Sequence, residues 1–151
     1  MSYLWYSVRT LLGLILRRPI LGTCVIPLMP DGQIVLVRRR DTGLWGLPGG
    51  LVDWGEDILA AASRELVEET GLEVTGLERL VGVYSSPGRD PRFHSVCVAL
   101  ATYVQGTPQV GDPREILEVK AFPAHLVLQE NLSHDHVHHL QDYFKGATVL
   151  A

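Results

Sequence analysis

The sequence feature that most constrains this chain is a cluster of glutamates inside one predicted helix. The pattern of residues 56–70 predicts a helix, and Gly71 stands in the usual helix-ending position. Glu65, Glu68 and Glu69 are three and four residues apart, so they share one face of that helix. The fold therefore has to place three carboxylates side by side.

A stripe of Leu59, Ala62 and Leu66 beside this face can pack against a sheet. Three like charges on one face destabilise an isolated helix by about 0.2–0.5 kcal/mol per pair. Either exposure to water or a bound cation relieves that repulsion. Charge runs usually face solvent, whereas clustered carboxylate oxygens suit a hard cation such as Mg2+ or Mn2+.

The residues around the cluster favour the cation. Pro48-Gly49-Gly50 lies just upstream, where a backbone carbonyl can turn inward as a further oxygen ligand. Residues 50–72 resemble the complete Nudix box, G-x5-E-x7-R-E-U-x-E-E-x-G-U, in which U is aliphatic. The matching positions are Gly50, Glu56, Arg64, Glu65, Leu66, Glu68, Glu69, Gly71 and Leu72.

The resemblance implies an α/β fold, a Nudix-type α/β/α sandwich with a mixed β-sheet. It also implies Mg2+ as the cofactor, with Mn2+ as its substitute. By this resemblance the ion is held by four groups, Glu65, Glu68, Glu69 and the Gly49 carbonyl.

Other box residues would support these ligands. The resemblance implies that Arg64 orients the glutamates and that Glu56 supports the box through a salt bridge, with Gly50 and Gly71 shaping the backbone.

The general base is left open by the sequence. Glu65 and Glu69 are candidates, and the family often adds a carboxylate from a later loop. Here that residue is Glu115 or Glu118, with Asp112 behind them.

Two features upstream of the box are candidate substrate contacts. Strand alternation puts Arg38 and Arg40 on one face, where they either end a solvated strand or steer phosphates. Trp45 either stacks on a base or packs its loop against the core.

The segment of residues 85–94, SSPGRDPRFH, offers a second set of substrate contacts. Arg89 and Arg92 can grip a phosphate in forked geometry, or the segment is a polar surface loop. The segment is similar to the loop pattern S-x-P-x-R-D-P-R-G-H of the short ADP-ribose pyrophosphatase branch. Phe93 replaces the glycine of that pattern, so the branch assignment is weaker than the family assignment.

Composition excludes several other classes of protein. The net charge of −4 provides no global basic field for duplex nucleic acid. Cys24 and Cys97 each lie in an apolar run and are predicted to be buried thiols in a reducing compartment. The histidines at 134, 136, 138 and 139 are predicted to be structural, although a zinc role is conceivable.

The chain of 151 residues divides into an amphipathic helix within residues 1–18 and a Nudix domain over residues 19–151. The helix, predicted at residues 3–16, docks on its own domain or on a second copy, and a homodimer is one outcome. Its three arginines also allow peripheral membrane contact. The longest apolar run there is too short to span a bilayer, which favours a cytoplasmic protein.

The remaining pattern predicts a mixed sheet with helices on its faces. Pro30-Asp31-Gly32 predicts a hairpin between residues 23–28 and 33–37, and residues 41–54 are irregular or form short strands. Further strands are expected at 77–84, 93–104 and 116–122, a loop at 85–92, and a helix at 133–144.

The functional expectation is Mg2+-dependent hydrolysis of the pyrophosphate bond of a nucleoside diphosphate linked to another moiety. ADP-ribose or a nucleotide sugar is the first choice of substrate. Hydrolysis of (oxidised) nucleoside triphosphates is the alternative. A non-catalytic module that senses nucleotides is a third hypothesis, which the complete set of glutamates disfavours, because a sensor has no need of metal ligands.

Overall fold

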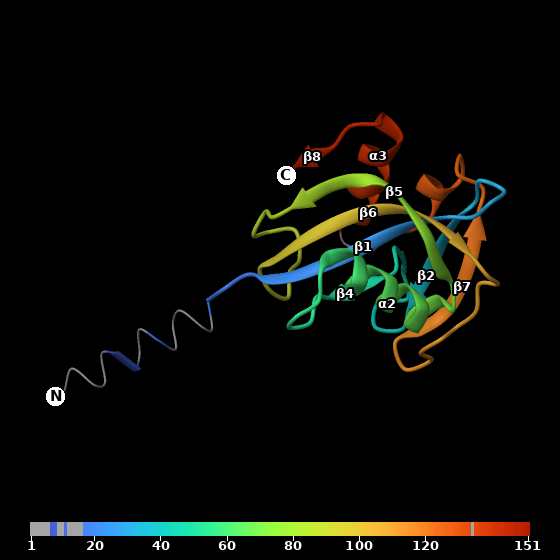
Figure 1. Cartoon of the computed structure of the whole chain (residues 1–151). Coiled ribbons are helices and arrows are strands. Elements are labelled where there is room, and N and C mark those ends of the chain that lie inside the picture. The colour runs from blue at the N-terminus through green and yellow to red at the C-terminus, as the bar shows by residue number, and fades with distance from the viewer. Residues whose placement is uncertain (1–6, 9–10, 12–16, 134) are drawn as a thin grey trace.

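The computed structural model describes residues 7, 8, 11, 17–133 and 135–151. Within them, one eight-stranded sheet runs through the protein (Figure 1). The strands are β1 Ile20–Leu28, β2 Ile34–Arg39, β3 Trp45–Gly46, β4 Gly49–Leu51, β5 Glu73–Tyr84, β6 Ser95–Gln105, β7 Ile116–Phe122 and β8 Val149–Leu150. The helices are α2 Ile58–Thr70, the short 3-10 helix η1 Val127–Gln129 and α3 His136–Lys145.

The sheet is mixed, as the sequence predicts. Its main path runs β3-β2-β1-β6-β5-β8, with β4 paired to β1 and β7 paired to β2. The β1–β6 and β5–β8 pairs are parallel, and the other pairs are antiparallel. The predicted hairpin is present, because β1 and β2 pair antiparallel around Pro30-Asp31-Gly32.

Each face of the sheet is covered by a helix (Figure 1). Alternation along β1 decides which residue goes to which face. Ile26 lies in one core cluster with Leu140 of α3, whereas its neighbour Val25 lies in another cluster with Ala62 of α2. The expected α/β/α sandwich is therefore confirmed.

Helix α2 begins two residues later than predicted. The Asp57 side chain accepts a hydrogen bond from the Ala60 N–H at 2.8 Å, which makes Asp57 the N-cap and leaves Glu56 outside the helix. Gly71 ends the helix as predicted, in a left-handed conformation with φ 69°.

The buried stripe of α2 also differs from the prediction. Leu66 and Ala62 are buried as expected, but Leu59 is 39% exposed and Ala61 is buried in its place. The buried face of the helix is therefore rotated slightly away from the stripe that the sequence suggested.

Helix α3 begins at His136 and not at the predicted residue 133. The Ser133 N–H donates to the Trp45 carbonyl at 2.7 Å, which holds this residue beside β3. Leu140 is fully buried, but Phe144 is 44% exposed and His139 is buried beside Leu140.

Strand pairing extends two elements beyond their predicted limits. β5 starts at Glu73 because its partner β6 continues to Gln105, and Glu73 pairs with that residue. β6 starts only at Ser95, which leaves Phe93 in the preceding loop. The two-residue strand β8 was not predicted.

The helix expected over residues 3–16 falls mainly outside the described residues. Ser7, Val8 and Leu11, which are described, are helical. Among the described residues, no helix has the length and apolar character needed to cross a bilayer.

The packing of α2 makes a prediction for stability. Leu66→Ala should lower the free energy of unfolding by about 2–5 kcal/mol, because it leaves a cavity where a fully buried side chain stood. The matched control is Val67→Ala, since Val67 is 47% exposed and should change stability by about 0.5 kcal/mol or less. Chemical denaturation measures both. Equal losses in the two variants would contradict this account of the core.

Candidate active site

A cavity of about 440 Å³ is bordered by β4 and by the C-terminal half of α2. Glu65, Glu68 and Glu69 of α2 line it, together with Gly49 and Gly50 of β4. The volume is in the range of small-molecule sites. The sequence-predicted metal ligands therefore lie together in one cavity.

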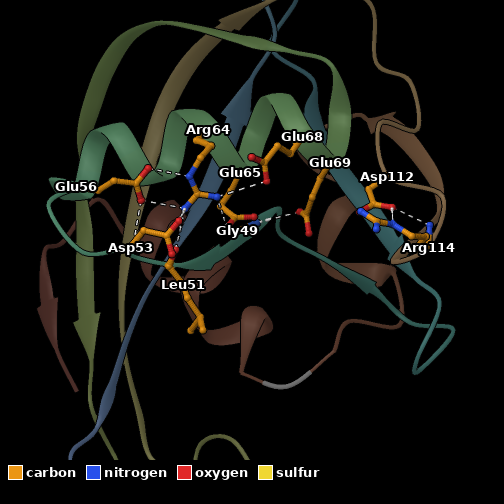
Figure 2. Close-up of polar contacts among 10 residues, drawn as sticks. All are labelled: Gly49, Leu51, Asp53, Glu56, Arg64, Glu65, Glu68, Glu69, Asp112 and Arg114. Carbon is orange, nitrogen blue, oxygen red and sulfur yellow. Dashed lines mark hydrogen bonds and ion pairs between the residues drawn. The ribbon is translucent and has the colours of Figure 1, made fainter.

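Arg64 organises the start of the box (Figure 2). Its guanidinium donates to both oxygens of Glu56, at 2.7 and 2.9 Å, and to the Leu51 carbonyl at 3.1 Å. This paired contact stabilises the carboxylate, and Arg64 lowers the pKa of Glu56 to about 2. Asp53 lies 3.6 Å from the same guanidinium, a contact that sequence reasoning missed.

The same arginine reaches the glutamate cluster. Its Nη1 donates to Glu65 at 2.8 Å and to Glu68 at 3.4 Å. Arg64 therefore links the loop before α2 to two of the three predicted metal ligands, and one side chain positions both (Figure 2).

Glu69 is the most buried of the three glutamates, with 4% of its surface exposed. Burial raises its pKa to about 8, and the neighbouring charge of Glu65 adds to the rise. The Gly49 N–H donates to its carboxylate at 3.1 Å and opposes the rise. The contact that Gly49 makes with the cluster is thus through its N–H, whereas its carbonyl role stays a prediction.

Glu65 is crowded as well as buried. Burial raises its pKa, while Arg64 works in the other direction. Gly50 is required beside it, since a Cβ at that position would overlap the Glu65 carboxylate. A Cβ at Gly49 would collide with the Thr23 carbonyl oxygen of β1. The two glycines let the loop approach both the sheet and the glutamates.

The later carboxylates separate into two groups. Asp112 and Glu115 line the cavity, and the charge of Glu115 contributes to the raised pKa of Glu69. Arg114 donates to Asp112 at 2.8 Å, on the side of the cluster opposite Glu56 (Figure 2). Glu118 instead lies on β7 near Arg38, at 3.8 Å, and is not among the described residues that line the cavity.

Of the three arginines at the end of β2, the structure places Arg39 at the cavity and not Arg38 or Arg40, the two predicted to share a face. Strand register shifts between Arg38 and Arg39 where β2 pairs with β7, because Leu117 of β7 is an extra residue in that pairing. Arg39 lines the cavity and binds Asp41 at 2.9 Å. Arg40 donates to the Pro113 carbonyl at 3.0 Å and is not among the described lining residues.

Trp45 packs its loop against the core, which is one of the two roles that the sequence allowed. Its ring meets Phe122 edge-on, with 5.0 Å between centroids, and it packs against the core cluster that contains Leu36. Among the described residues that line the cavity, Trp45 does not occur.

The two arginines of the 85–94 loop line the cavity but are engaged there. Arg89 donates to both oxygens of Asp135, at 3.1 and 3.2 Å, and to Ser95. Arg92 is bound by Asp90 at 2.9 Å, yet 48% of its side chain is exposed. Arg92 is therefore the more accessible of the two predicted phosphate contacts.

Phe93 also lines the cavity and is 37% exposed. The Arg92 guanidinium carbon lies 5.1 Å from the centre of its ring, within the range of a cation–π contact. The residue that departs from the short-branch pattern thus lies beside the accessible arginine.

The histidines of α3 have a neighbour that the sequence did not indicate. His136 Nδ1 accepts a hydrogen bond from the Leu47 N–H at 2.9 Å, which ties the helix to the loop before β4. His139 Nδ1 lies 3.2 Å from Cys24 Sγ. A cysteine therefore lies beside these histidines. Cys24 and Cys97 are free and buried, as predicted.

The donor set of the cavity fits a hard divalent cation. Three carboxylates of one helix converge there, and two of them have pKa values raised by burial in the absence of an ion. A cation with oxygen preference would replace the lost hydration of these groups. Mg2+ and Mn2+ both satisfy this requirement.

The burial of Glu69 predicts that its ionised carboxylate lowers the stability of the metal-free protein. Its folded pKa of about 8 exceeds the ordinary 4.5, so metal-free protein loses stability as pH rises through that interval. Glu69→Gln removes this loss. We expect it to raise the unfolding free energy of metal-free protein at pH 8 by about 1–3 kcal/mol, and by less at pH 5.

The matched control is Glu68→Gln, because the Glu68 side chain is 54% exposed. This variant should show no gain. Thermal unfolding in chelator at both pH values measures the difference. A destabilised Glu69→Gln at pH 8 would contradict the assignment of a costly buried carboxylate.

Comparison with known proteins agrees with this geometry. The NUDIX domain family model matches residues 18–143. An ADP-ribose pyrophosphatase of Methanocaldococcus jannaschii is 34% identical over 122 residues, which are 76% of this chain and 68% of that protein. A putative 8-oxo-dGTP diphosphatase of Bacillus subtilis is 50% identical over 66 residues, or 44% of each protein.

A solved structure gives the same result. The crystal structure of a MutT NUDIX hydrolase from Burkholderia pseudomallei is similar with a TM-score of 0.71 and 28% identity, covering 83% of this chain and 98% of the other. With the family match spanning most of the sequence and a complete box folded around one cavity, this chain belongs to the Nudix hydrolase family.

Proposed function

We propose that this protein hydrolyses the pyrophosphate bond of a nucleoside diphosphate linked to another moiety, with Mg2+ as its cofactor. The observation that carries the proposal is the convergence of Glu65, Glu68 and Glu69 on one cavity around a carboxylate whose pKa burial raises to about 8. Such a cluster of partly buried carboxylates lowers the stability of the protein unless a bound cation compensates its charge.

In this proposal Glu65, Glu68 and Glu69 hold the ion, assisted by the Gly49 carbonyl. The bound cation supplies neutralisation of phosphate charge and acidification of an attacking water. Arg64 keeps two of these carboxylates in place through its contacts at 2.8 and 3.4 Å. The glutamates themselves need no rearrangement, because Arg64 and Gly49 already orient them.

A carboxylate of this set takes the proton of the attacking water. Glu69 is a candidate because it lines the cavity beside Glu65. Glu65 and Glu115 are the others, since both line the cavity. Glu118 is the weaker choice, because its described contact is with Arg38 of β2 and it is not among the described residues that line the cavity.

ADP-ribose or a nucleotide sugar is the proposed substrate. The relative that is 34% identical over 122 residues is described as an ADP-ribose pyrophosphatase. Arg92 is positioned for a terminal phosphate, since it lines the cavity and half of its side chain is exposed. Arg89 acts indirectly, by holding Asp135 and the loop.

Nucleoside triphosphates, oxidised ones included, are the second candidate. The similarity to a putative 8-oxo-dGTP diphosphatase is higher in identity, although it covers 44% of the chain. Phe93 also favours nucleoside triphosphates, because its bulky ring lines the cavity and occupies space that a ribose phosphate would need. A purely sensing role is disfavoured by the complete and converging glutamates.

Other properties stay predictions. They are the division at residues 18 and 19, homodimer formation, membrane contact through residues 1–18 and a cytoplasmic location. The proposed partner is a nucleotide-derived small molecule. The net charge of −4 disfavours duplex nucleic acid as a partner.

The reaction is tested with a substrate panel in Mg2+, read by product analysis. We expect release of two phosphate-bearing products from ADP-ribose or a nucleotide sugar. Glu69→Gln should keep the fold and lose most activity, by about 100-fold or more, because it removes a charged ligand and preserves shape. Glu118→Gln is the control and should stay near wild type. Normal turnover by Glu69→Gln would refute the proposed role.

The substrate class is tested at the accessible arginine. Arg92→Ala should lower kcat/KM for diphosphate-linked substrates about tenfold or more, because a charge-assisted contact contributes about 1.5–3 kcal/mol. Mg2+ affinity should be unchanged. Arg38→Ala is the matched control, since Arg38 is 46% exposed but lies off the cavity. If wild-type protein prefers nucleoside triphosphates by tenfold or more, the second candidate replaces the first.

A further inference from the structure

A second cluster of potential ligands borders the same cavity through two of its three residues and takes no part in the proposed hydrolysis. Cys24 of β1, Cys97 of β6 and His139 of α3 place their sulfur and nitrogen atoms within 4.8 Å of one another. All three residues are buried. They come from three separate elements, so the tertiary fold alone brings them together.

Strand pairing explains how the two cysteines share a face. β1 and β6 are parallel, with Cys24 opposite Ala99 and Cys97 opposite Gly22. The cysteines are therefore diagonal neighbours on the face that α3 covers. From that helix, His139 turns its Nδ1 to 3.2 Å from Cys24 Sγ.

The other nitrogen of His139 has the partner that a metal-binding histidine requires. Nε2 lies 3.1 Å from Asp135 Oδ2, and Asp135 is itself held by Arg89 at 3.1 Å. A carboxylate at Nε2 keeps the proton there and leaves the Nδ1 lone pair for a ligand. The Tyr84 ring, with its centre 3.9 Å from that of His139, fixes the orientation of the imidazole.

The cluster is reachable from solvent. Cys24, Cys97 and Asp135 are among the residues that line the cavity of the glutamates. Two thiolates and one imidazole form a zinc-type donor set, and three protein ligands leave one tetrahedral position open. The glutamates, in contrast, offer oxygen donors alone, so the two sets select different ions.

Two other roles for the cysteines fit the geometry less well. A disulfide is one such role, but both cysteines are free thiols in the structure. A nucleophile needs a thiolate, but a hydrogen bond with Cys97 and burial raise the pKa of Cys24 well above its usual range.

We propose that Cys24, Cys97 and His139 form a binding site for a thiophilic divalent cation of the zinc type, separate from the glutamate site. Asp135 supports the site through His139. On binding, the two thiols release their protons to solvent, and the resulting thiolates neutralise the divalent charge. The inference does not depend on the proposed hydrolysis, since the two sites share no ligand.

Cobalt(II) tests the site on the full-length protein. Reduced, chelator-treated protein is titrated with CoCl2 in excess MgCl2, which keeps the glutamates occupied. We expect saturation near one Co2+ per chain, with a sulfur-to-cobalt charge-transfer band in the near ultraviolet. One equivalent of Zn2+ should abolish that band. Oxygen ligands give no such band, so the glutamate site cannot imitate the result.

Variants assign the ligands. Cys97→Ser should reduce the band by about half, because one of two thiolates remains, and Cys24→Ser should do the same. His138→Ala is the matched control, since His138 lies exposed on the same helix, and it should keep the full band. Glu69→Gln should also keep it, even where hydrolysis is lost.

The outcomes against the proposal are equally definite. Folded wild-type protein that takes up Co2+ without a charge-transfer band, or takes up none, overturns it. A band that survives undiminished in both serine variants overturns it as well. The wild-type spectrum decides the question even if a substituted protein fails to fold.

Discussion

The contacts of Arg64 hold the candidate active site together. Three glutamates on one helix face repel each other, and two of them are withdrawn from water. Arg64 offsets part of that repulsion, because its guanidinium binds Glu65 and Glu68 while Glu56 holds it from the opposite side. The planar fork of an arginine suits this task, since a lysine cannot serve several carboxylates in fixed directions.

The described hydrogen bonds of Arg64 with glutamates do not extend to Glu69. The Gly49 N–H donates a hydrogen bond to its carboxylate, while burial raises its pKa to about 8. The cluster is therefore only partly neutralised by protein groups. A divalent cation would supply the positive charge that the protein groups do not. The proposed function and the energetic cost of the site therefore both arise from the same buried carboxylates.

How much of this was predictable from sequence depends on how local each feature is. The box, its spacing and the helix ended by Gly71 are local patterns, and their residues do gather in one cavity. The choice between Arg39 and Arg40 was not local. Alternation separates Arg39 from Arg38 and Arg40, but which face of β2 meets the cavity depends on where the cavity lies in the fold.

The cysteine cluster shows the same limit more strongly. Cys24, Cys97 and His139 are far apart in sequence, and no spacing rule joins them. Their meeting depends on the parallel register of β1 with β6 and on the packing of α3 over that face. Similarly, the contact of Arg89 with Asp135 depends on the 85–94 loop lying beside α3, which no local pattern predicts.

The proposed function requires a buried glutamate whose negative charge a bound cation compensates. The titration of that glutamate with and without Mg2+ tests this requirement directly. Carbon-13 NMR of protein labelled at glutamate side chains follows each carboxyl group as a function of pH. Without metal, one glutamate should titrate near pH 8, and saturating Mg2+ should move that transition below about pH 5. The account is contradicted if every glutamate titrates in the ordinary range without metal, or if Mg2+ leaves the high transition unchanged.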